Sequence, residues 1–127
     1  MSTPRILVVD DDEGIGEFVG LALSDEGYEV ATALHGAVAL EVIGRQAPDV
    51  ILLDMRMPIM DGWEFARRYR ERPGPHAPIV VMTAARDAAT RASEIEADGV
   101  LAKPFDLDAL LEIVARFTPR PGRPAAS

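Results

Sequence analysis

The chain has 127 residues, of which 48% are hydrophobic, so it is long and apolar enough for one folded domain with a sizeable core. It contains no cysteine, which excludes a disulfide framework and a thiolate metal site. Its formal net charge of −8 disfavours direct binding to nucleic acid, because the phosphate backbone requires clustered lysine and arginine.

The N-terminal residues 1–5 show no signal-peptide pattern, and no apolar run approaches the roughly 20 residues that a membrane-spanning helix needs. We therefore expect a cytoplasmic protein without membrane insertion. Residues 6–9 form a wholly apolar run, which predicts a buried strand. Three acidic residues follow this strand directly, namely Asp10, Asp11 and Asp12.

A helix is predicted next, because apolar residues recur at three- and four-residue spacing from Ile15 to Leu23. Asp12 is either the N-cap of this helix or a third acid near a metal, and Gly27 is a plausible C-terminal stop. Residues 28–33 mix polar with apolar side chains, which predicts a strand nearer the edge of a sheet.

The central strand is predicted at residues 50–54, where four large apolar residues run without a break and end on Asp54. A helix that starts at Gly36 precedes it. A loop at residues 55–62 follows it, as its proline and Asp-Gly pair indicate. Carboxyl ends of strands are where open α/β sheets place their ligands and chemistry, so Asp54 is a candidate site residue.

A third helix is predicted from about Gly62 to Arg72, with Trp63 and Phe65 interpreted as packing residues and the arginines of residues 67–72 as a solvated face. The third apolar run, residues 79–82, ends on the hydroxyl of Thr83.

The helix predicted at residues 87–97 is unusual, because Ile95 is its only large apolar residue. It should bury little area and be locally weak. Residues 100–102 form a short strand that ends at Lys103 and Pro104. A last helix follows, with Leu107, Leu110, Leu111 and Val114 as its core stripe. We expect residues 1–117 to form the domain and residues 118–127, which hold three prolines, to form a flexible tail or the start of a linker.

This order repeats a strand and a helix five times, which predicts an α/β fold with a five-stranded parallel sheet and helices on both faces. All strand ends then point to one edge. That edge collects Asp10, Asp11, Asp12, Asp54, Thr83 and Lys103.

The chemistry of this set points to phosphoryl transfer. Crowded carboxylates repel each other unless they are protonated, paired or bound to a metal, and oxygen donors suit Mg²⁺. Lysine and threonine supply the positive charge and the hydroxyl donor that phosphoryl oxygens require. A carboxylate beside both a cation and an anion site can act as the nucleophile.

The chain resembles a receiver domain of two-component response regulators, of the chemotaxis-regulator type. Four stretches carry the resemblance, and with their spacing they cover nearly the whole chain: residues 6–13, 52–62, 81–84 and 102–105. The resemblance implies a flavodoxin-like fold with strand order 2-1-3-4-5.

By position, the resemblance implies that Asp54 accepts a phosphoryl group from the phosphohistidine of a histidine kinase. Asp10 and Asp11 match the acidic pair that holds Mg²⁺, together with Asp54. Arg56 matches the position whose backbone carbonyl is a further metal ligand.

Three more positions match residues of the family's site. Thr83 matches the switch hydroxyl, Lys103 the lysine that pairs with a phosphoryl oxygen, and Pro104 a proline that follows a cis peptide bond. One position departs from the family, because Val100 stands where an aromatic ring usually rotates inward. The helix at residues 87–97 is then a candidate for the element that moves instead.

The implied partners are a sensor histidine kinase or histidine phosphotransfer protein, and a downstream protein target or output domain that reads the surface around the fourth helix, fifth strand and fifth helix. We expect a monomer or weak dimer. The family phosphorylates and dephosphorylates itself with Mg²⁺, so the expected role is a signalling phospho-acceptor rather than an enzyme.

Three other functions remain as alternatives. A Mg²⁺-dependent phosphohydrolase typically has a second acid two residues after its nucleophile, where this chain has Arg56. A flavin- or nucleotide-binding module needs a glycine- or hydroxyl-rich loop where residues 10–13 are all acidic. A receiver that has lost phosphorylation would serve only as a docking domain, yet all five key positions are filled.

Overall fold

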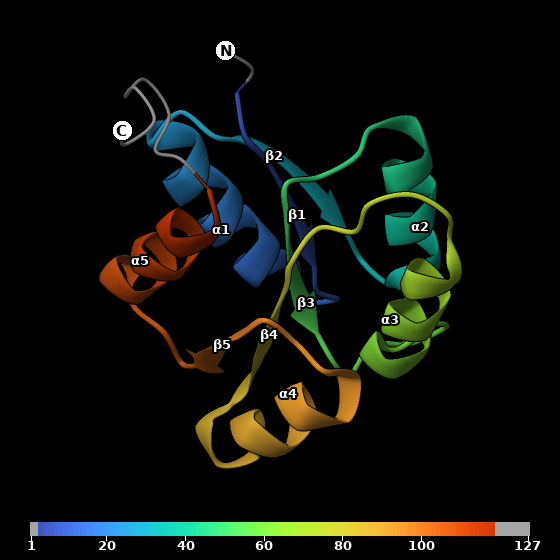
Figure 1. Ribbon diagram of the computed structural model, residues 1–127. Helices are drawn as coiled ribbons and strands as arrows, with labels where there is room; N and C mark the ends of the chain where they lie inside the picture. The colour runs from blue at the N-terminus through green and yellow to red at the C-terminus, as the bar shows by residue number, and fades with distance from the viewer. Residues whose placement is uncertain (1–2, 119–127) are drawn as a thin grey trace.

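The sheet has the predicted topology. The structure is a computed structural model that describes residues 3–118. Five parallel strands lie in the order β2-β1-β3-β4-β5 (Figure 1), which confirms the flavodoxin-like α/β fold and places β2 at an edge as predicted. The strands are β1 (Arg5–Val9), β2 (Glu29–Ala33), β3 (Val50–Asp54), β4 (Ile79–Ala84) and β5 (Gly99–Lys103).

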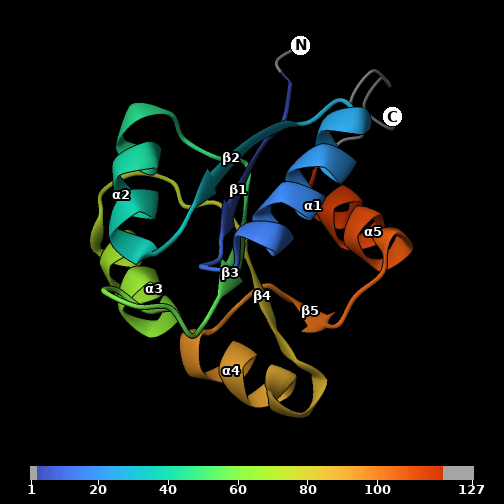
Figure 2. The same ribbon diagram turned by 180° about the vertical axis from the view of Figure 1, so that it is seen from behind.

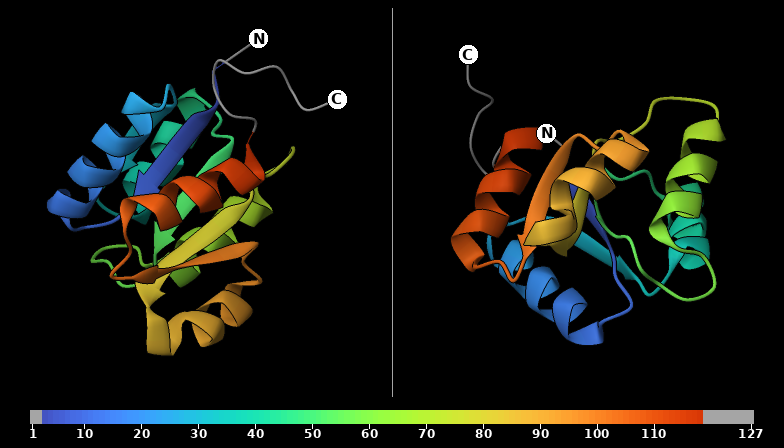
Figure 3. Two further views of the ribbon diagram at one scale, coloured as in Figure 1. Left: turned by 90° about the vertical axis from the view of Figure 1, so that its left-hand side faces the viewer. Right: turned by 90° about the horizontal axis from the view of Figure 1, so that it is seen from below.

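Five helices connect and cover the strands. They are α1 (Glu13–Asp25), α2 (Gly36–Arg45), α3 (Gly62–Glu71), α4 (Ala88–Ile95) and α5 (Leu107–Phe117). Helices α1 and α5 lie on one side of the sheet and α2 and α3 on the other (Figures 1 and 2), with α4 beside β4 and β5 (Figure 3). Within residues 3–118, no helix combines the length and apolar character needed to cross a membrane.

The wholly apolar strands are explained by two cores, one on each side of the sheet. In β1, Leu7 and Val9 pack with α2 and α3, whereas Ile6 and Val8 pack with α1 and α5. Because successive side chains of a strand point to opposite faces, a strand covered on both faces must be apolar at every position.

The start of α1 confirms the capping interpretation of Asp12. Its carboxylate accepts the backbone N–H groups of Gly14 at 2.8 Å and of Ile15 at 3.3 Å. After the helix, Gly27 adopts a φ of 93°, a left-handed conformation that favours glycine and ends the helix as predicted.

The prediction that the fourth helix buries little area is confirmed, whereas its bounds differ from the predicted residues 87–97. Ala88 and Ile95 are its only buried residues. The chain enters it through a 3-10 turn at Ala85–Asp87, so the helical segment starts earlier than the sequence indicated.

Two predictions about side chains are wrong. The spacing predicts Leu107 in the core stripe of α5, but this residue is the first of the helix and is 45% exposed. Ile113 is buried in that stripe instead. Arg70 and Arg72 are not part of a solvated face, because both are half-buried and donate to backbone carbonyls of neighbouring segments.

The C-terminal tail expected at residues 118–127 lies outside the described residues except for Thr118. The hydroxyl of Thr118 is buried, donates to the carbonyl of Val114 at 2.9 Å and lies 3.2 Å from the hydroxyl of Tyr28.

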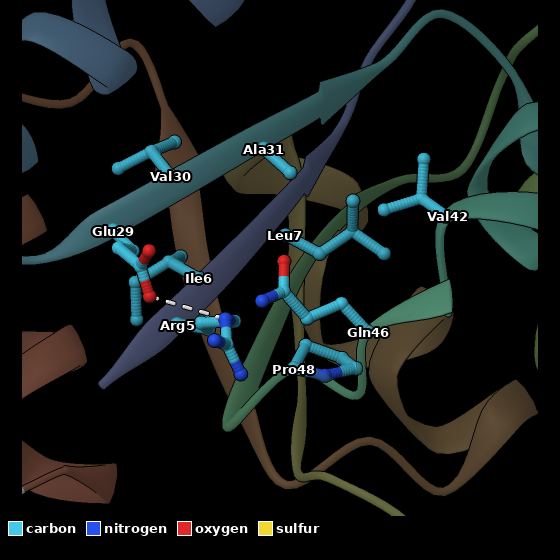
Figure 4. Close-up of a pocket in the computed structure, with 9 residues that line it drawn as sticks. All are labelled: Arg5, Ile6, Leu7, Glu29, Val30, Ala31, Val42, Gln46 and Pro48. Carbon is cyan, nitrogen blue, oxygen red and sulfur yellow. Dashed lines mark ion pairs between the residues drawn. The ribbon is translucent and has the colours of Figure 1, made fainter. Parts of the chain in front are cut away.

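A small hollow opens at the amino ends of the strands, between β1, β2 and the end of α2 (Figure 4). Its floor includes Leu7, Ala31 and Val42, and an ion pair of 3.1 Å between Arg5 and Glu29 lies at its rim. It lies at the edge opposite to the predicted site, so we assign it no part in the chemistry below.

Candidate functional site

The strand register brings the predicted site residues to one edge. Val9 pairs with Leu53, so Asp10 and Asp54 follow at the same level on adjacent strands. Asp54 in turn pairs with Met82, which places Thr83 one residue further along β4. The parallel arrangement therefore collects at this edge residues that are far apart in the sequence.

Three carboxylates converge there. Asp10, Asp11 and Asp54 each offer an oxygen atom, and these atoms lie within 4.8 Å of one another. Asp10 is 3% exposed and Asp54 is half-buried, whereas Asp11 is open to solvent. Carboxylate oxygens at this spacing, one of them solvent-accessible, fit a hard divalent cation that keeps part of its water shell.

Lys103 supplies the positive charge of the site. Its Nζ donates to Asp10 at 2.9 Å and lies 3.7 Å from Asp54. Burial of the ammonium opposes its charge, but the hydrogen bond and charge of Asp10, with the charge of Asp54, outweigh burial and raise the pKa of Lys103. Lys103 is therefore held in its charged form between the two carboxylates.

Asp54 has an unusual proton affinity. Burial and the negative charge of Asp10 raise the pKa of Asp54 from 3.8 to about 6, although Lys103 and a backbone hydrogen bond from Arg56 act in the opposite direction. Burial, together with the negative charge of the neighbouring carboxylates, thus outweighs the stabilisation that Lys103 gives to the ionised form of Asp54. A second cation at this position would relieve the excess negative charge.

The loop after β3 is fixed tightly against Asp54. The N–H of Gly62 donates to the carbonyl of Met55 at 2.9 Å. A Cβ at Gly62 would lie 2.7 Å from Cα of Met55 and 3.0 Å from the carbonyl oxygen of Asp54. Only glycine fits this close approach, which explains the Asp-Gly pair of the predicted loop. Asp61 then caps α3 by accepting the N–H of Glu64 at 3.0 Å.

The remaining predicted residues lie around this cluster. The side chain of Arg56 is exposed and lines an open hollow with Asp11, Asp61 and Trp63. Thr83 is half-buried at the end of β4. The peptide bond between Lys103 and Pro104 is cis, as the resemblance implied.

The two histidines interpreted as loop residues are not members of the acidic cluster. His35 directly precedes α2, and its Nδ1 is buried without a hydrogen-bond partner in the described part of the chain. His76 packs edge-on against the ring of Tyr69, with centroids 4.9 Å apart.

One contact beside the site was not predicted. The indole N–H of Trp63, interpreted as a packing residue, donates to Glu94 of α4 at 3.2 Å. These residues are 31 positions apart and lie on two different helices, so no periodicity of the sequence could have paired them.

Comparisons with known proteins identify one family that the chain matches. The family described as response regulator receiver domain matches residues 6–115. A response regulator MprA of Mycobacterium leprae is 42% identical over 109 residues, which are 84% of this chain and 47% of the relative. A second MprA, of Mycolicibacterium vanbaalenii, is 40% identical over 93% of this chain and 53% of its own length. This chain therefore spans about half the length of these curated relatives.

Solved structures give the same result. The chemotaxis response regulator CheY4 of Vibrio cholerae superposes with a TM-score of 0.84 at 34% identity, over 92% of this chain and all of that one. The receiver domain of NtrX from Brucella abortus superposes with a TM-score of 0.79 at 33% identity, over 87% of this chain and 95% of its own.

Proposed function

This chain belongs to the response regulator receiver domain family of two-component signalling, and we propose from this that it is switched by phosphorylation of Asp54. The observation that carries the proposal is the position of Asp54 at the end of the central strand, near Asp10, Asp11 and Lys103. Asp54 thus lies beside two carboxylates that can bind a metal ion with it, and beside the positive charge of Lys103.

Asp54 is the proposed nucleophile. One of its carboxylate oxygens attacks the phosphorus of a phosphohistidine, so that a P–O bond forms while the P–N bond breaks and the bonding electron pair stays with the imidazole, which takes up a proton. Because the pKa of Asp54 is about 6, the carboxylate is mostly ionised at neutral pH and can act without a general base. Lys103 and Thr83 are the proposed partners of the phosphoryl oxygens.

The proposed cofactor is Mg²⁺, held by Asp10, Asp11, Asp54 and the backbone carbonyl of Arg56. When bound, it would offset the negative charge that gathers on the transferring group. The donor set supports this assignment, because three carboxylate oxygens within 4.8 Å of one another match a hard cation.

The partners belong to the same proposal. We assign the receiver to residues 1–117, with the buried Thr118 packed against it, and a tail or the start of a linker to the residues that follow. The phosphoryl donor is a histidine kinase or histidine phosphotransfer protein in the cytoplasm, and a downstream protein or output domain reads the surface around α4, β5 and α5. The chain itself is a phospho-acceptor that catalyses only its own phosphorylation and dephosphorylation.

Intact mass after incubation with acetyl phosphate tests the proposal. We expect the native chain to gain one phosphoryl group in the presence of Mg²⁺ and none after chelation with EDTA. Asp54→Asn should gain none in either case, because its side chain lacks the nucleophilic oxygen.

Asp12→Asn is the matched control. It removes a neighbouring carboxylate that caps α1 and lies outside the acidic cluster, and asparagine is an equally good N-cap. This variant should be phosphorylated as the native chain is. A phosphoryl group on Asp54→Asn, or on the native chain in EDTA, would contradict the assignment of acceptor or metal. If the native chain gains no mass, beryllofluoride binding followed by Trp63 fluorescence separates a slow donor from a silent receiver.

A further inference from the structure

The turn between β2 and α2 supplies no side chain to the acidic cluster, yet its backbone contacts both segments that carry the proposed metal ligands. The carbonyl of Ala33, at the end of β2, accepts the N–H of Asp10 at 3.0 Å. Three residues later, the N–H of Gly36 at the start of α2 donates to the carbonyl of Met60 at 3.0 Å. Two backbone hydrogen bonds therefore connect the segment after β1 with the loop after β3 through this turn.

Gly36 and Met60 pack against each other without spare room. Met60 is 7% exposed and belongs to the core that α2 and α3 cover. A Cβ at Gly36 would lie 2.8 Å from Cγ of Met60, 2.9 Å from its Sδ and 3.0 Å from its carbonyl oxygen. Because this crowding includes the backbone of Met60, rotation of the methionine side chain cannot relieve all of it, and a larger residue at position 36 must displace Met60.

Met60 is one of two buried methionines that fix the loop after β3. Met55, near the start of this loop, is 1% exposed, whereas residues 56–59 between the two methionines are exposed or half-buried. Directly before Met60, Ile59 keeps a φ of 69°, an unfavourable conformation for a residue with a Cβ. Such a residue persists where its surroundings fix it, and the bond from Gly36 to Met60 supplies this constraint.

The loop held in this way carries the backbone of Arg56, which faces the site. The N–H of Arg56 forms a hydrogen bond with the carboxylate of Asp54, and the carbonyl of Arg56 is the proposed further ligand of Mg²⁺. The side chain of Arg56 is exposed, while Met55 precedes it directly and Met60 follows four residues later. The two buried methionines therefore determine where the backbone of Arg56 lies.

We propose that Gly36 is a positioning residue of the Mg²⁺ site, which holds the loop after β3 in place relative to Asp10. Gly36 acts through Met60 on the backbone of Arg56. The same turn holds the backbone of Asp10 through Ala33. The proposal rests on the proposed function, because the metal ligands are those assigned there. Residues that orient metal ligands without touching the metal commonly change metal affinity when they are replaced.

Calorimetric titration of the full chain with MgCl₂ tests this role. We expect Gly36→Ala to weaken Mg²⁺ binding by about tenfold, the lower end of the effect of replacing a residue behind a metal ligand. All carboxylates are still present in this variant, so the loss reports the position of the ligands and not their number. Gly99→Ala is the matched control. It adds the same methyl group at a crowded position, 3.2 Å from the ring of Phe117, but at the amino end of β5, opposite to the site. It should keep the native affinity.

A double variant tests whether Gly36 acts through Met60. Met60→Ala removes Cγ and Sδ, two of the three atoms that crowd a Cβ at position 36. The combined variant Gly36→Ala with Met60→Ala should therefore lose less Mg²⁺ affinity, on a logarithmic scale, than the sum of the two single losses. Urea unfolding in EDTA shows which variants are folded. If Gly36→Ala does not fold, Met60→Ala decides alone, because it removes the same contact from the other side and should also weaken Mg²⁺ binding.

Three results would overturn the role of Gly36: native Mg²⁺ affinity in a folded Gly36→Ala or Met60→Ala chain, additive losses in the double variant, or an equal loss of affinity in Gly99→Ala. The acetyl phosphate experiment keeps the two proposals apart. If the native chain binds no Mg²⁺, the proposed cofactor fails and the role of Gly36 with it. If the native chain is phosphorylated with Mg²⁺ but Gly36→Ala binds the ion equally well, only the role of Gly36 is rejected.

Discussion

Lys103 donates its 2.9 Å hydrogen bond to Asp10 and lies further, at 3.7 Å, from Asp54. Asp10 is almost fully buried, so without Lys103 it would keep a negative charge away from water and beside two other carboxylates. We expect Lys103→Met to lower the free energy of unfolding by about 3 kcal/mol at neutral pH without metal, the low end of the range for broken buried pairs, because Lys103 itself is partly exposed. Urea unfolding measures this loss.

A double variant separates this pairing from simple loss of packing. In Lys103→Met with Asp10→Asn, the uncompensated charge is absent, so the combined loss should be clearly smaller than the sum of the two single losses. Additive losses would mean that Lys103 does not stabilise Asp10.

The pKa of Asp54 predicts a pH dependence of stability. Because this pKa rises from 3.8 to about 6 on folding, the folded chain binds more protons than the unfolded chain between these values. The free energy of unfolding should therefore fall as the pH rises from about 4 to about 6, by an amount on the order of 3 kcal/mol for two pKa units.

Asp54→Asn isolates this contribution, since it cannot ionise at position 54. In EDTA at neutral pH it should be more stable than the native chain by about 1 to 3 kcal/mol, and the difference should vanish near pH 4. Mg²⁺ should reduce it by stabilising the ionised native chain. Parallel stability curves for the two chains across this range would show that the environment of Asp54 does not disfavour its charge.

Two glycines should respond oppositely to alanine. A Cβ at Gly62 would collide with the backbone of Met55, so Gly62→Ala should lower the free energy of unfolding by about 1 to 3 kcal/mol and reduce phosphorylation at the adjacent Asp54. At Gly20 in α1 a Cβ would meet only Val30, at 4.0 Å. Gly20→Ala should therefore add about 0.5 to 1 kcal/mol, and thermal unfolding of both variants tests the contrast.

Ile59 is strained at the tip of the loop after β3. It has a φ of 69°, in the left-handed region, while its side chain is 81% exposed and packs against little. Ile59→Gly should raise the free energy of unfolding by about 1 kcal/mol through relief of this conformation. Ile59→Ala keeps the Cβ and should gain far less. An equal gain in both variants would mean that the effect comes from removing the exposed isoleucine side chain and not from relief of backbone strain.

Much of this arrangement follows from the sequence because its signals are local. Each wholly apolar run became a strand buried on both faces, and the residue after each run reached the common edge, as Asp10 and Asp54 show. The same holds for Asp12, whose role as a cap depends only on the next three residues.

What the sequence could not reveal depends on contacts between distant polar residues. The sequence predicts Arg70 as one member of a charged helix face. Only the packing of α3 beside α4 allows its guanidinium to donate to the carbonyl of Ile95. The exposure of Leu107 depends likewise on how far α5 extends beyond the sheet, because its spacing alone matches the buried stripe.

The pairing of Lys103 with Asp10 joins positions 93 residues apart. During synthesis, Asp10 leaves the ribosome long before the lysine that neutralises it, and every strand between them must be added first. Contacts of such large sequence separation slow folding, because the loop-closure entropy must be overcome before the contact forms. The proposed phospho-acceptor site is thereby complete only when β5, which ends on Lys103, has joined the sheet.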